Sequence, residues 1–274
     1  MAGKLYVVGT PIGNLGDFSE RAKEVLRSVD FIAAEDTRVT VKLLNHFDIK
    51  KPLVAYFEHN RNERGKLIID RILAGETAAV VTDAGMPAIS DPGEDLVRLA
   101  KENGIEVESV PGPVAFATAL AVSGMPSGRF CFEGFLSVNR QSRMSHLESL
   151  KNERRTMIFY EAPHKLLKTL GDMLGYFGDR EIAVARELTK IHEDVWRTTL
   201  SQAYAFYSEN NPKGEFVLII GGNTQQEDKQ YTYEETVLLA RKLKDDGLSA
   251  SEAAKQAASE TGYKKGEIYK EIMG

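Results

Sequence analysis

Predicted strands and amphipathic helices alternate five times within the first ~110 residues, which is the pattern of repeated strand–helix–strand units. Each crossover helix returns the chain to the same edge of a sheet, so the strands that it joins lie parallel. The short apolar runs that predict these strands are 5–8, 31–34, 53–56, 78–81 and 105–110. We therefore predict an α/β fold with a five-stranded parallel sheet in an N-terminal domain over residues 1–113.

The alternation changes after residue 113. Residues 114–122 form an apolar run that predicts a helix, and a polar segment with several arginines occupies 138–155. Further strands are predicted at 129–135, 156–160, 181–187, 195–200 and 215–220. We predict that residues 114–222 form a second α/β domain with a mixed sheet.

The C-terminal segment is predicted to be a small helical module over residues 230–274, joined by a polar linker at 221–228. Ser249 and Glu252 have the spacing of a capping box, which predicts a helix start. Short helices around an alanine-rich one resemble a helix-turn-helix. A helical dimerisation appendage explains the pattern equally well, so both interpretations stay open.

Composition excludes several classes of protein. The 274 residues, 42% hydrophobic and 27% charged, suit a globular protein of about two domains, and no apolar run approaches the ~20 residues of a membrane span. Cys131 is the single cysteine and the N-terminus lacks a signal-peptide pattern, so we expect a cytoplasmic protein with a buried structural thiol. Without Cys-x-x-Cys or His-x-x-x-His spacing we expect no metal site. The net charge of −5 argues against a general nucleic-acid coat, although it allows a local basic face.

The segment 82–93, Thr-Asp-Ala-Gly-Met-Pro-Ala-Ile-Ser-Asp-Pro-Gly, follows the predicted strand at 78–81. Loops at the carboxyl ends of parallel strands hold the ligands of open α/β sheets. Prolines fix φ, and glycine lets the backbone approach a ligand closely. We predict that this central loop is the floor of a ligand-binding crevice, with an ordinary strand–helix connection as the alternative.

The loop from Gly9 to Gly16 has the spacing Gly-x-x-x-Gly-x-x-Gly and contains Pro11, so it departs from the dinucleotide-binding spacing. Asp36 lies where a ribose-binding acid would, but Arg38 beside it makes an ion pair an equal explanation. NAD is therefore the weaker alternative for the ligand.

Several longer motifs span residues 8–17, 34–38, 82–93, 110–113, 159–164 and 185–190, with the strand that ends at Ile220-Gly221. These motifs resemble the tetrapyrrole methylase superfamily, and within it the branch that methylates small-subunit ribosomal RNA. Met86 is a mild departure, because that branch more often has threonine there. The resemblance covers essentially the whole chain. It implies methyl transfer from S-adenosylmethionine to the 2′-oxygen of a cytidine in ribosomal RNA of the small ribosomal subunit.

The resemblance also implies a homodimer that holds the cofactor in the cleft between the two α/β domains. Adenosylmethionine lacks phosphates, so its site needs backbone donors and apolar walls instead of a phosphate cradle. The cofactor contacts implied by position are Pro11, Ala84, Gly85, Met86, Ile89, Val114, Ala115, Tyr160 and Glu161.

A ribose hydroxyl is weakly acidic, so a positioned base would help its attack on a methyl group. Lys190 is the first catalytic candidate, provided that burial or neighbouring cations lower its pKa, and Asp36 and Glu187 are the others. The alternative is a salt-bridged strand end that includes Glu161 and Arg186.

Basic side chains are candidates for contact with the substrate phosphates, with a solvated charged face as the alternative. Arg38, Arg186 and His164, which is also a possible base, belong to the α/β domains. Lys264 and Lys265 belong to the helical module, and the arginines between 140 and 155 extend the set.

Two other functions stay open at this point. One is methylation of a small tetrapyrrole, against which the helical module and the segment 35–38 argue. The other is a non-catalytic RNA-binding or assembly factor that keeps the fold.

Overall fold

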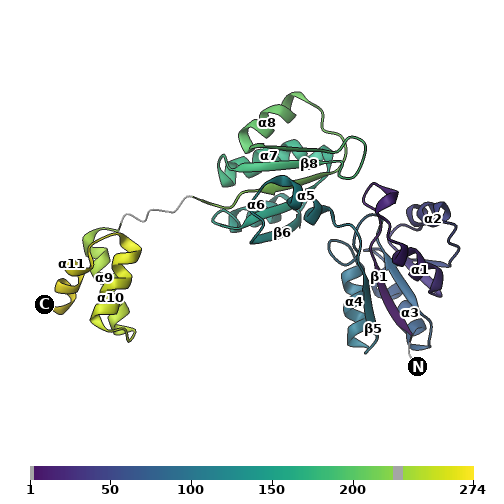
Figure 1. Ribbon diagram of the computed structural model, residues 1–274, viewed down its shortest axis with the longest axis horizontal. Helices are drawn as coiled ribbons and strands as arrows, with labels where there is room; N and C mark the ends of the chain where they lie inside the picture. The colour runs from purple at the N-terminus through teal and green to yellow at the C-terminus, as the bar shows by residue number, and fades with distance from the viewer. Residues whose placement is uncertain (1–2, 225–230) are drawn as a thin grey trace. The chain divides into compact units, whose positions relative to one another are not determined.

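The computed structural model describes residues 3–224 and 231–274, and the chain divides into two compact units, residues 1–223 and 224–274 (Figure 1). Part of the predicted linker, 225–228, and residue 230 lie outside the described residues. No helix of the described ranges is long and apolar enough to cross a membrane.

The first sheet contains five parallel strands in the order β3-β2-β4-β1-β5, which confirms the prediction. They are β1 (Lys4–Val8), β2 (Phe31–Ala34), β3 (Leu53–Ala55), β4 (Ala78–Val81) and β5 (Glu106–Val110). Both faces of this sheet are covered, as parallel sheets require. The covering helices are α1 (Glu20–Ser28) and α2 (Thr37–His46) on one face, α3 (Arg61–Leu73) and α4 (Gly93–Glu102) on the other.

Two apolar clusters show which helix packs on which face. Alternate residues of β1 point to opposite faces, so Leu5 packs with Ile68 of α3 whereas Val8 packs with Leu26 of α1. Ser19 accepts a hydrogen bond from the Ala22 N–H at 3.1 Å and caps α1.

The second sheet is mixed, as predicted, with the order β6-β7-β10-β8-β9. β6 (Phe130–Phe135) pairs parallel to β7 (Thr156–Glu161). The antiparallel pairs join β7, β10 (Phe216–Ile220), β8 (Glu181–Arg186) and β9 (Asp194–Thr199).

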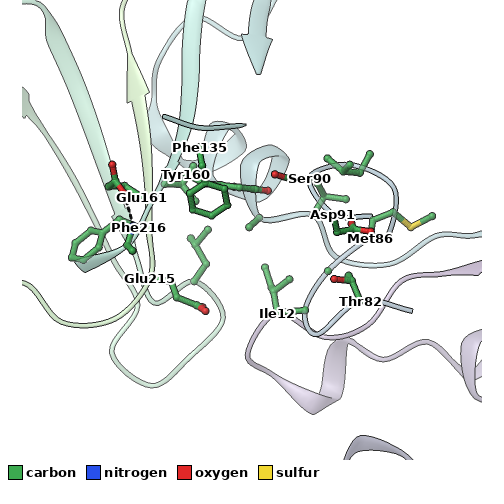
Figure 2. A pocket seen from close by; sticks show the side chains of 18 of the residues that line it. Ile12, Thr82, Met86, Ser90, Asp91, Phe135, Tyr160, Glu161, Glu215 and Phe216 are labelled. Carbon is green, nitrogen blue, oxygen red and sulfur yellow. Dashed lines mark hydrogen bonds between the residues drawn. The ribbon is translucent and has the colours of Figure 1, made fainter. Parts of the chain in front are cut away.

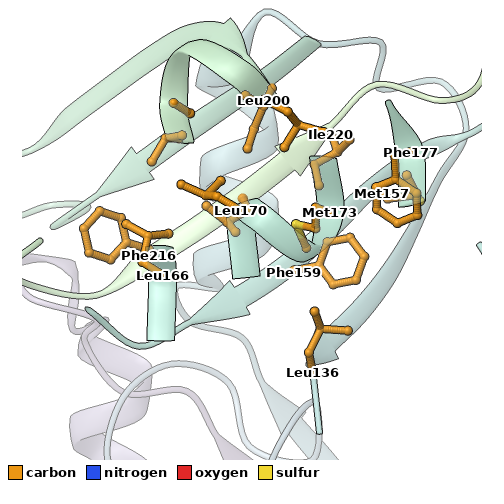
Figure 3. Packing of buried hydrophobic residues seen from close by; sticks show 14 of the residues in the cluster. Leu136, Met157, Phe159, Leu166, Leu170, Met173, Phe177, Leu200, Phe216 and Ile220 are labelled. Carbon is orange, nitrogen blue, oxygen red and sulfur yellow. The ribbon is translucent and has the colours of Figure 1, made fainter. Parts of the chain in front are cut away.

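Four helices cover this second sheet. One face packs on α7 (Pro163–Phe177), α8 (Leu200–Glu209) and α6 (Arg140–Ser149) around the apolar cluster shown in Figure 3. The apolar helix α5 (Ala115–Ser123) packs on the other face. Sequence analysis assigned no helix within 138–155, because this segment has too few apolar residues to show a helical period. Leu147 on the buried side of α6 and Leu150 at its end are the apolar residues that are buried there.

The second unit contains α9 (Tyr233–Asp245), α10 (Ala250–Thr261) and α11 (Lys265–Met273) around a core of its own. Ala253, Ala254 and Ala257 are fully buried, so their small side chains allow the neighbouring helices close approach. The capping box of Ser249 and Glu252 is present at the start of α10, as predicted. Gly262 ends α10 with φ of +80°.

Candidate active site

A cavity of about 470 Å³ lies within the first unit, where the carboxyl ends of the first sheet face one edge of the second sheet. Its walls come from the loops after β1, β4 and β5 and from the ends of β6, β7 and β10 (Figure 2). β1 and β4 are parallel neighbours, so the loops that follow them lie side by side. Open α/β sheets bind their ligands at such a position.

All the predicted cofactor contacts except Pro11 line this cavity. Pro11 is buried, and the adjacent Ile12 contributes the lining side chain of that loop. The predicted residues that the cavity brings together are Ala84, Gly85, Met86, Ile89, Val114, Ala115, Tyr160 and Glu161.

Backbone contacts hold the first loop against its neighbours. Thr10 and Gly85 exchange backbone hydrogen bonds of 2.9 and 3.2 Å, which ties the first loop to the central loop. A Cβ atom at Gly9 would lie 2.6 Å from Gly112 Cα, so the first loop and the loop after β5 can touch only through two glycines. These contacts fix three walls of the cavity relative to one another.

Asp91 organises the central loop. Its Oδ1 accepts hydrogen bonds from the Gly93 N–H at 2.8 Å and from the Ala88 N–H at 3.2 Å. Ala88 has φ of +65°, a conformation that a residue with a Cβ rarely adopts. The carboxylate therefore holds a tight turn that presents Ile89 and Ser90 to the cavity.

Tyr160 joins the two sheets through α5. Val114, the N-cap residue of α5, makes no side-chain capping bond, and the Phe116 N–H donates instead to the Tyr160 hydroxyl at 3.1 Å. Burial raises the pKa of Tyr160, so its hydroxyl stays neutral. A residue of the second sheet thus caps the helix that carries Val114 and Ala115.

Glu161 is a buried carboxylate with both oxygens satisfied. Oε2 accepts from the Thr169 hydroxyl at 2.5 Å, and Oε1 accepts from the Ala162 N–H at 2.8 Å. These partners differ from the cation that a salt-bridged strand end would supply. Glu161 is therefore a carboxyl group held in a fixed position in the cavity wall.

Lys190 forms an ion-pair cluster at the edge of the cavity. Its Nζ donates to Glu187 Oε1 at 2.9 Å and to Glu215 Oε2 at 3.2 Å, and Glu215 lines the cavity. Burial lowers the pKa of Lys190, but the hydrogen bonds to the two carboxylates outweigh burial, and the pKa lies above its ordinary value. The same contact lowers the pKa of Glu187. The condition for Lys190 as a base, a lowered pKa, is therefore not met.

Asp36 pairs with Arg38 rather than facing the cavity. Its Oδ1 accepts from the Arg38 N–H at 2.8 Å and caps α2, while its Oδ2 lies 2.6 Å from the Arg38 guanidinium. These hydrogen bonds lower the pKa of Asp36 to about 2. Glu35 lines the cavity instead, and its carboxylate accepts from the Thr82 hydroxyl at 2.6 Å.

The predicted substrate contacts of the first unit lie around the cavity rather than in its lining. Arg38 is exposed at the start of α2, and His164 is exposed in the first turn of α7. Arg186 ends β8, with its guanidinium 3.9 Å from the Asp194 carboxylate. Arg143 is wrong as a phosphate contact, because its side chain is buried and pairs with Asp172.

Lys264 and Lys265 lie in the second unit, at the start of α11. Lys264 is exposed with its Nζ 3.8 Å from Glu267, and Lys265 donates to the Ser251 hydroxyl at 3.0 Å. Both ammonium groups have local partners and remain at the surface.

The thiol of Cys131 is not built for nucleophilic chemistry. Burial, with a hydrogen bond to Glu133, raises its pKa to about 12, so the thiolate is scarce at neutral pH. Within residues 3–224 and 231–274, no group of three His, Cys, Asp or Glu side chains is arranged to hold a metal ion.

Comparison with known proteins assigns the family. Residues 4–204 match the family model of the tetrapyrrole (corrin/porphyrin) methylases. The chain belongs to the tetrapyrrole methylase family.

Relatives within this methylase family align over most of the chain. A Synechocystis protein named ribosomal RNA small subunit methyltransferase I is 48% identical, over 97% of this chain and 96% of its own length. A protein of the same name from Bacillus subtilis is 43% identical, over 97% of this chain and 93% of its own length. The one from Thermotoga maritima is 49% identical over 80% of this chain and 99% of its own length. These identities place the chain in that branch of the tetrapyrrole methylases.

Solved methylase structures share the fold at low sequence identity. Diphthine synthase superposes with a TM-score of 0.61 at 12% identity, over 81% of this chain and 90% of the other. Uroporphyrin-III C-methyltransferase from Thermus thermophilus, in complex with S-adenosyl homocysteine, superposes with a TM-score of 0.57 at 16% identity. The match covers 80% of this chain and 97% of the other. At these identities the likeness concerns the fold alone.

Sequence analysis of this tetrapyrrole methylase predicted Tyr160 and Glu161 of β7 but missed the rest of the wall that the second sheet contributes. Phe135, Leu188, Glu215 and Phe216 also line the cavity. They do so because β6 and β8 end, and β10 begins, at the same end of the sheet as the carboxyl end of β7. The strand order needed to see this was not readable from the sequence. Glu35, Thr82, Ser90 and Asp91 also line the cavity and were not predicted as contacts. The sequence could have indicated them, because they belong to the motifs 34–38 and 82–93.

Proposed function

We propose that this chain transfers a methyl group from S-adenosylmethionine to the 2′-oxygen of a cytidine in ribosomal RNA of the small ribosomal subunit. Relatives 42–49% identical, all named as small-subunit ribosomal RNA methyltransferases, support the reaction and the class of substrate. The cytidine and the 2′-oxygen rest on the resemblance of the motifs.

The charge of the cavity wall is the observation that carries the choice of cofactor. Glu35, Asp91, Glu161 and Glu215 line the cavity, and within the described part of the chain no lysine or arginine belongs to the lining. Only Glu215 pairs with a cation, Lys190 at the edge, among the ion pairs of the described residues. A wall with carboxylates and apolar groups suits a cationic, phosphate-free ligand and opposes a pyrophosphate. The residues present therefore fit S-adenosylmethionine.

The structure also argues against NAD. A dinucleotide site places a helix N-terminus directly after the glycine-rich turn. Here Gly16 lies in a 3₁₀ turn (Leu15–Asp17), and α1 begins only at Glu20. The pairing of Asp36 with Arg38 also removes the ribose-binding acid.

S-adenosylmethionine supplies an activated methyl group on a sulfonium sulfur. The residues proposed to hold it are Pro11, Ala84, Gly85, Met86, Ile89, Val114, Ala115, Tyr160 and Glu161. Their backbone is fixed by the loop contacts and by the cap on α5, so little freedom is lost when ligands are held in alignment.

Among the catalytic candidates, we propose that Lys190 acts as a cation at the rim and not as the base. Its raised pKa keeps the ammonium group charged. Lowered pKa values make Asp36 and Glu187 weak bases too. Arg38, Arg186 and His164 are proposed to contact the RNA around the cavity, and Lys264 and Lys265 from the helical unit.

The function is tested by incubating the protein with methyl-labelled adenosylmethionine and unmethylated small ribosomal subunits. We expect label in the RNA and, after nuclease digestion, in 2′-O-methylcytidine. Label in a porphyrinoid but none in RNA would establish the tetrapyrrole alternative. Binding of subunits without transfer would favour the assembly-factor alternative.

A cytoplasmic homodimer is proposed as the working form of the protein, on the resemblance and on the single cysteine. Sedimentation equilibrium at micromolar concentration measures the mass of the particle. A mass of one chain of 30.4 kDa would contradict the dimer.

A further inference from the structure

The β-strand at the edge of the second sheet contains a bulge beside the cavity. The register of β6 against β7 pairs Cys131 with Met157 and Phe132 with Ile158, and it then shifts between Phe132 and Gly134. Gly134 has φ of +63°, which a glycine adopts without strain. β-Bulges bend a strand and re-aim side chains, often next to active sites.

The bulge changes the face to which Phe135 points. Before it, Cys131 packs with the cluster under α6, α7 and α8, whereas Phe132 packs on the opposite face with Tyr160. Strict alternation would place residue 135 on the face of Cys131. The extra residue reverses this, so Phe135 pairs with Tyr160 and its ring centroid lies 5.4 Å from that of Tyr160.

Phe135 therefore lies in the cavity wall with much of its ring uncovered. Phe135 lines the cavity (Figure 2) and is 55% exposed as a residue, and Ile89 of the central loop, which also lines the cavity, is 44% exposed. The inner wall is less open, since Gly85 is buried and Tyr160 is half-buried. The bulge thus turns an aromatic ring into the cavity wall, where its uncovered surface is available to a ligand.

We propose that Phe135 stacks on a base of the RNA at the mouth of the cavity and so positions the target nucleotide; this inference rests on the proposed function. A ribose between two sheets cannot keep its base stacked in the RNA, so the nucleotide must leave its stack. Proteins replace the stacking that such a base loses by stacking it on an aromatic side chain, and any of the four bases can stack in this way. The half-exposed ring is thus a substrate contact from the second sheet.

The test compares Phe135→Leu with Phe135→Tyr, which removes or keeps the aromatic face. Phe130→Leu is the matched control, because Phe130 lies on the same strand with 40% exposure and outside the cavity lining. We expect Phe135→Leu to raise the KM for small ribosomal subunits roughly tenfold. The Kd for adenosylmethionine from calorimetry should change less than twofold, and Phe135→Tyr and Phe130→Leu should resemble the wild type.

Three results would overturn the inference while wild-type transfer into RNA is intact. They are an unchanged KM for subunits in Phe135→Leu, a weakened Kd for adenosylmethionine with an unchanged KM, and an equal defect in Phe130→Leu. Should Phe135→Leu unfold, a rise in KM for Phe135→Tyr alone would equally refute stacking. Absence of transfer by the wild type would instead refute the proposed function, and the inference with it.

Discussion

At the scale of single residues, carboxylates and hydroxyls do structural work next to the cavity. Asp91 holds the turn at Ala88, and Asp36 caps α2 while it pairs with Arg38. The Tyr160 hydroxyl caps α5. The chemistry of the site thus depends on polar groups that fix backbone, and these groups need not touch a ligand.

Tyr160→Phe is expected to lower the free energy of unfolding by about 1 kcal/mol, because the N–H of Phe116 loses its cap. Affinity for adenosylmethionine should fall several-fold, since Val114 and Ala115 lose their anchor. Thermal unfolding and calorimetry measure the two effects. Tyr204→Phe, a surface tyrosine of α8, is the control and should change neither; equal affinities in both variants would contradict the role of the cap.

The Asp36–Arg38 pair should make stability depend on pH. The pKa of Asp36 is about 2, below its ordinary value, so its contribution is complete above about pH 5 and declines as the pH falls toward 2. Asp36→Asn keeps a capping oxygen and removes the charge. We expect the free energy of unfolding, measured with urea, to be higher for the wild type than for Asp36→Asn at pH 6, and the difference to be smaller at pH 3. A difference that is the same at both pH values would contradict the ion pair.

At the scale of elements, loops that follow parallel strands form the cavity because they touch each other. Gly9 and Gly112 meet backbone to backbone, and Gly13 packs against Lys190 of the loop after β8. That loop contains Thr189 with φ of +65°, so tertiary contacts hold it in a conformation that its sequence disfavours.

Gly112→Ala is expected to destabilise the protein by about 1–3 kcal/mol, because the new Cβ would lie 2.8 Å from Gly9 Cα. The two loops must separate, so the Kd for adenosylmethionine should rise at least tenfold. Gly128→Ala is the matched control, since no atom lies within 4 Å of its added Cβ. Wild-type affinity in Gly112→Ala would show that the contact does not shape the cavity.

At the scale of the whole molecule, the cavity belongs entirely to the first unit, because its lining runs from Ile12 to Val217. The three-helix unit has a separate core. The relative from Thermotoga maritima matches 80% of this chain over 99% of its own length, so about a fifth of this chain lies outside that match.

A variant that ends at residue 223 should bind adenosylmethionine with unchanged affinity, measured by calorimetry. A Kd changed more than threefold would contradict the independence of the two units.

In the full chain, Lys264→Ala with Lys265→Ala should lower the salt slope of subunit binding, by at most about 0.9 for each phosphate that the protein no longer neutralises. The control is Lys50→Ala with Lys66→Ala, two exposed lysines of the first unit. An unchanged slope would remove the helical unit from RNA contact.

The sequence by itself determined most of the elements and the loops, although not α6. Buried runs such as Ala78–Val81, caps such as Ser19 and Ser249, and glycines and prolines after strands act locally, so their effect is visible in neighbouring residues. Only the tertiary structure decided the order of the strands, the part of the cavity wall that β6, β8 and β10 contribute, the charge state of Lys190 and the direction of Phe135. Each of these depends on contacts between residues far apart in the chain. The bulge in β6, for example, turns Phe135 to the opposite face of the sheet, and it is seen only in the pairing of β6 with β7.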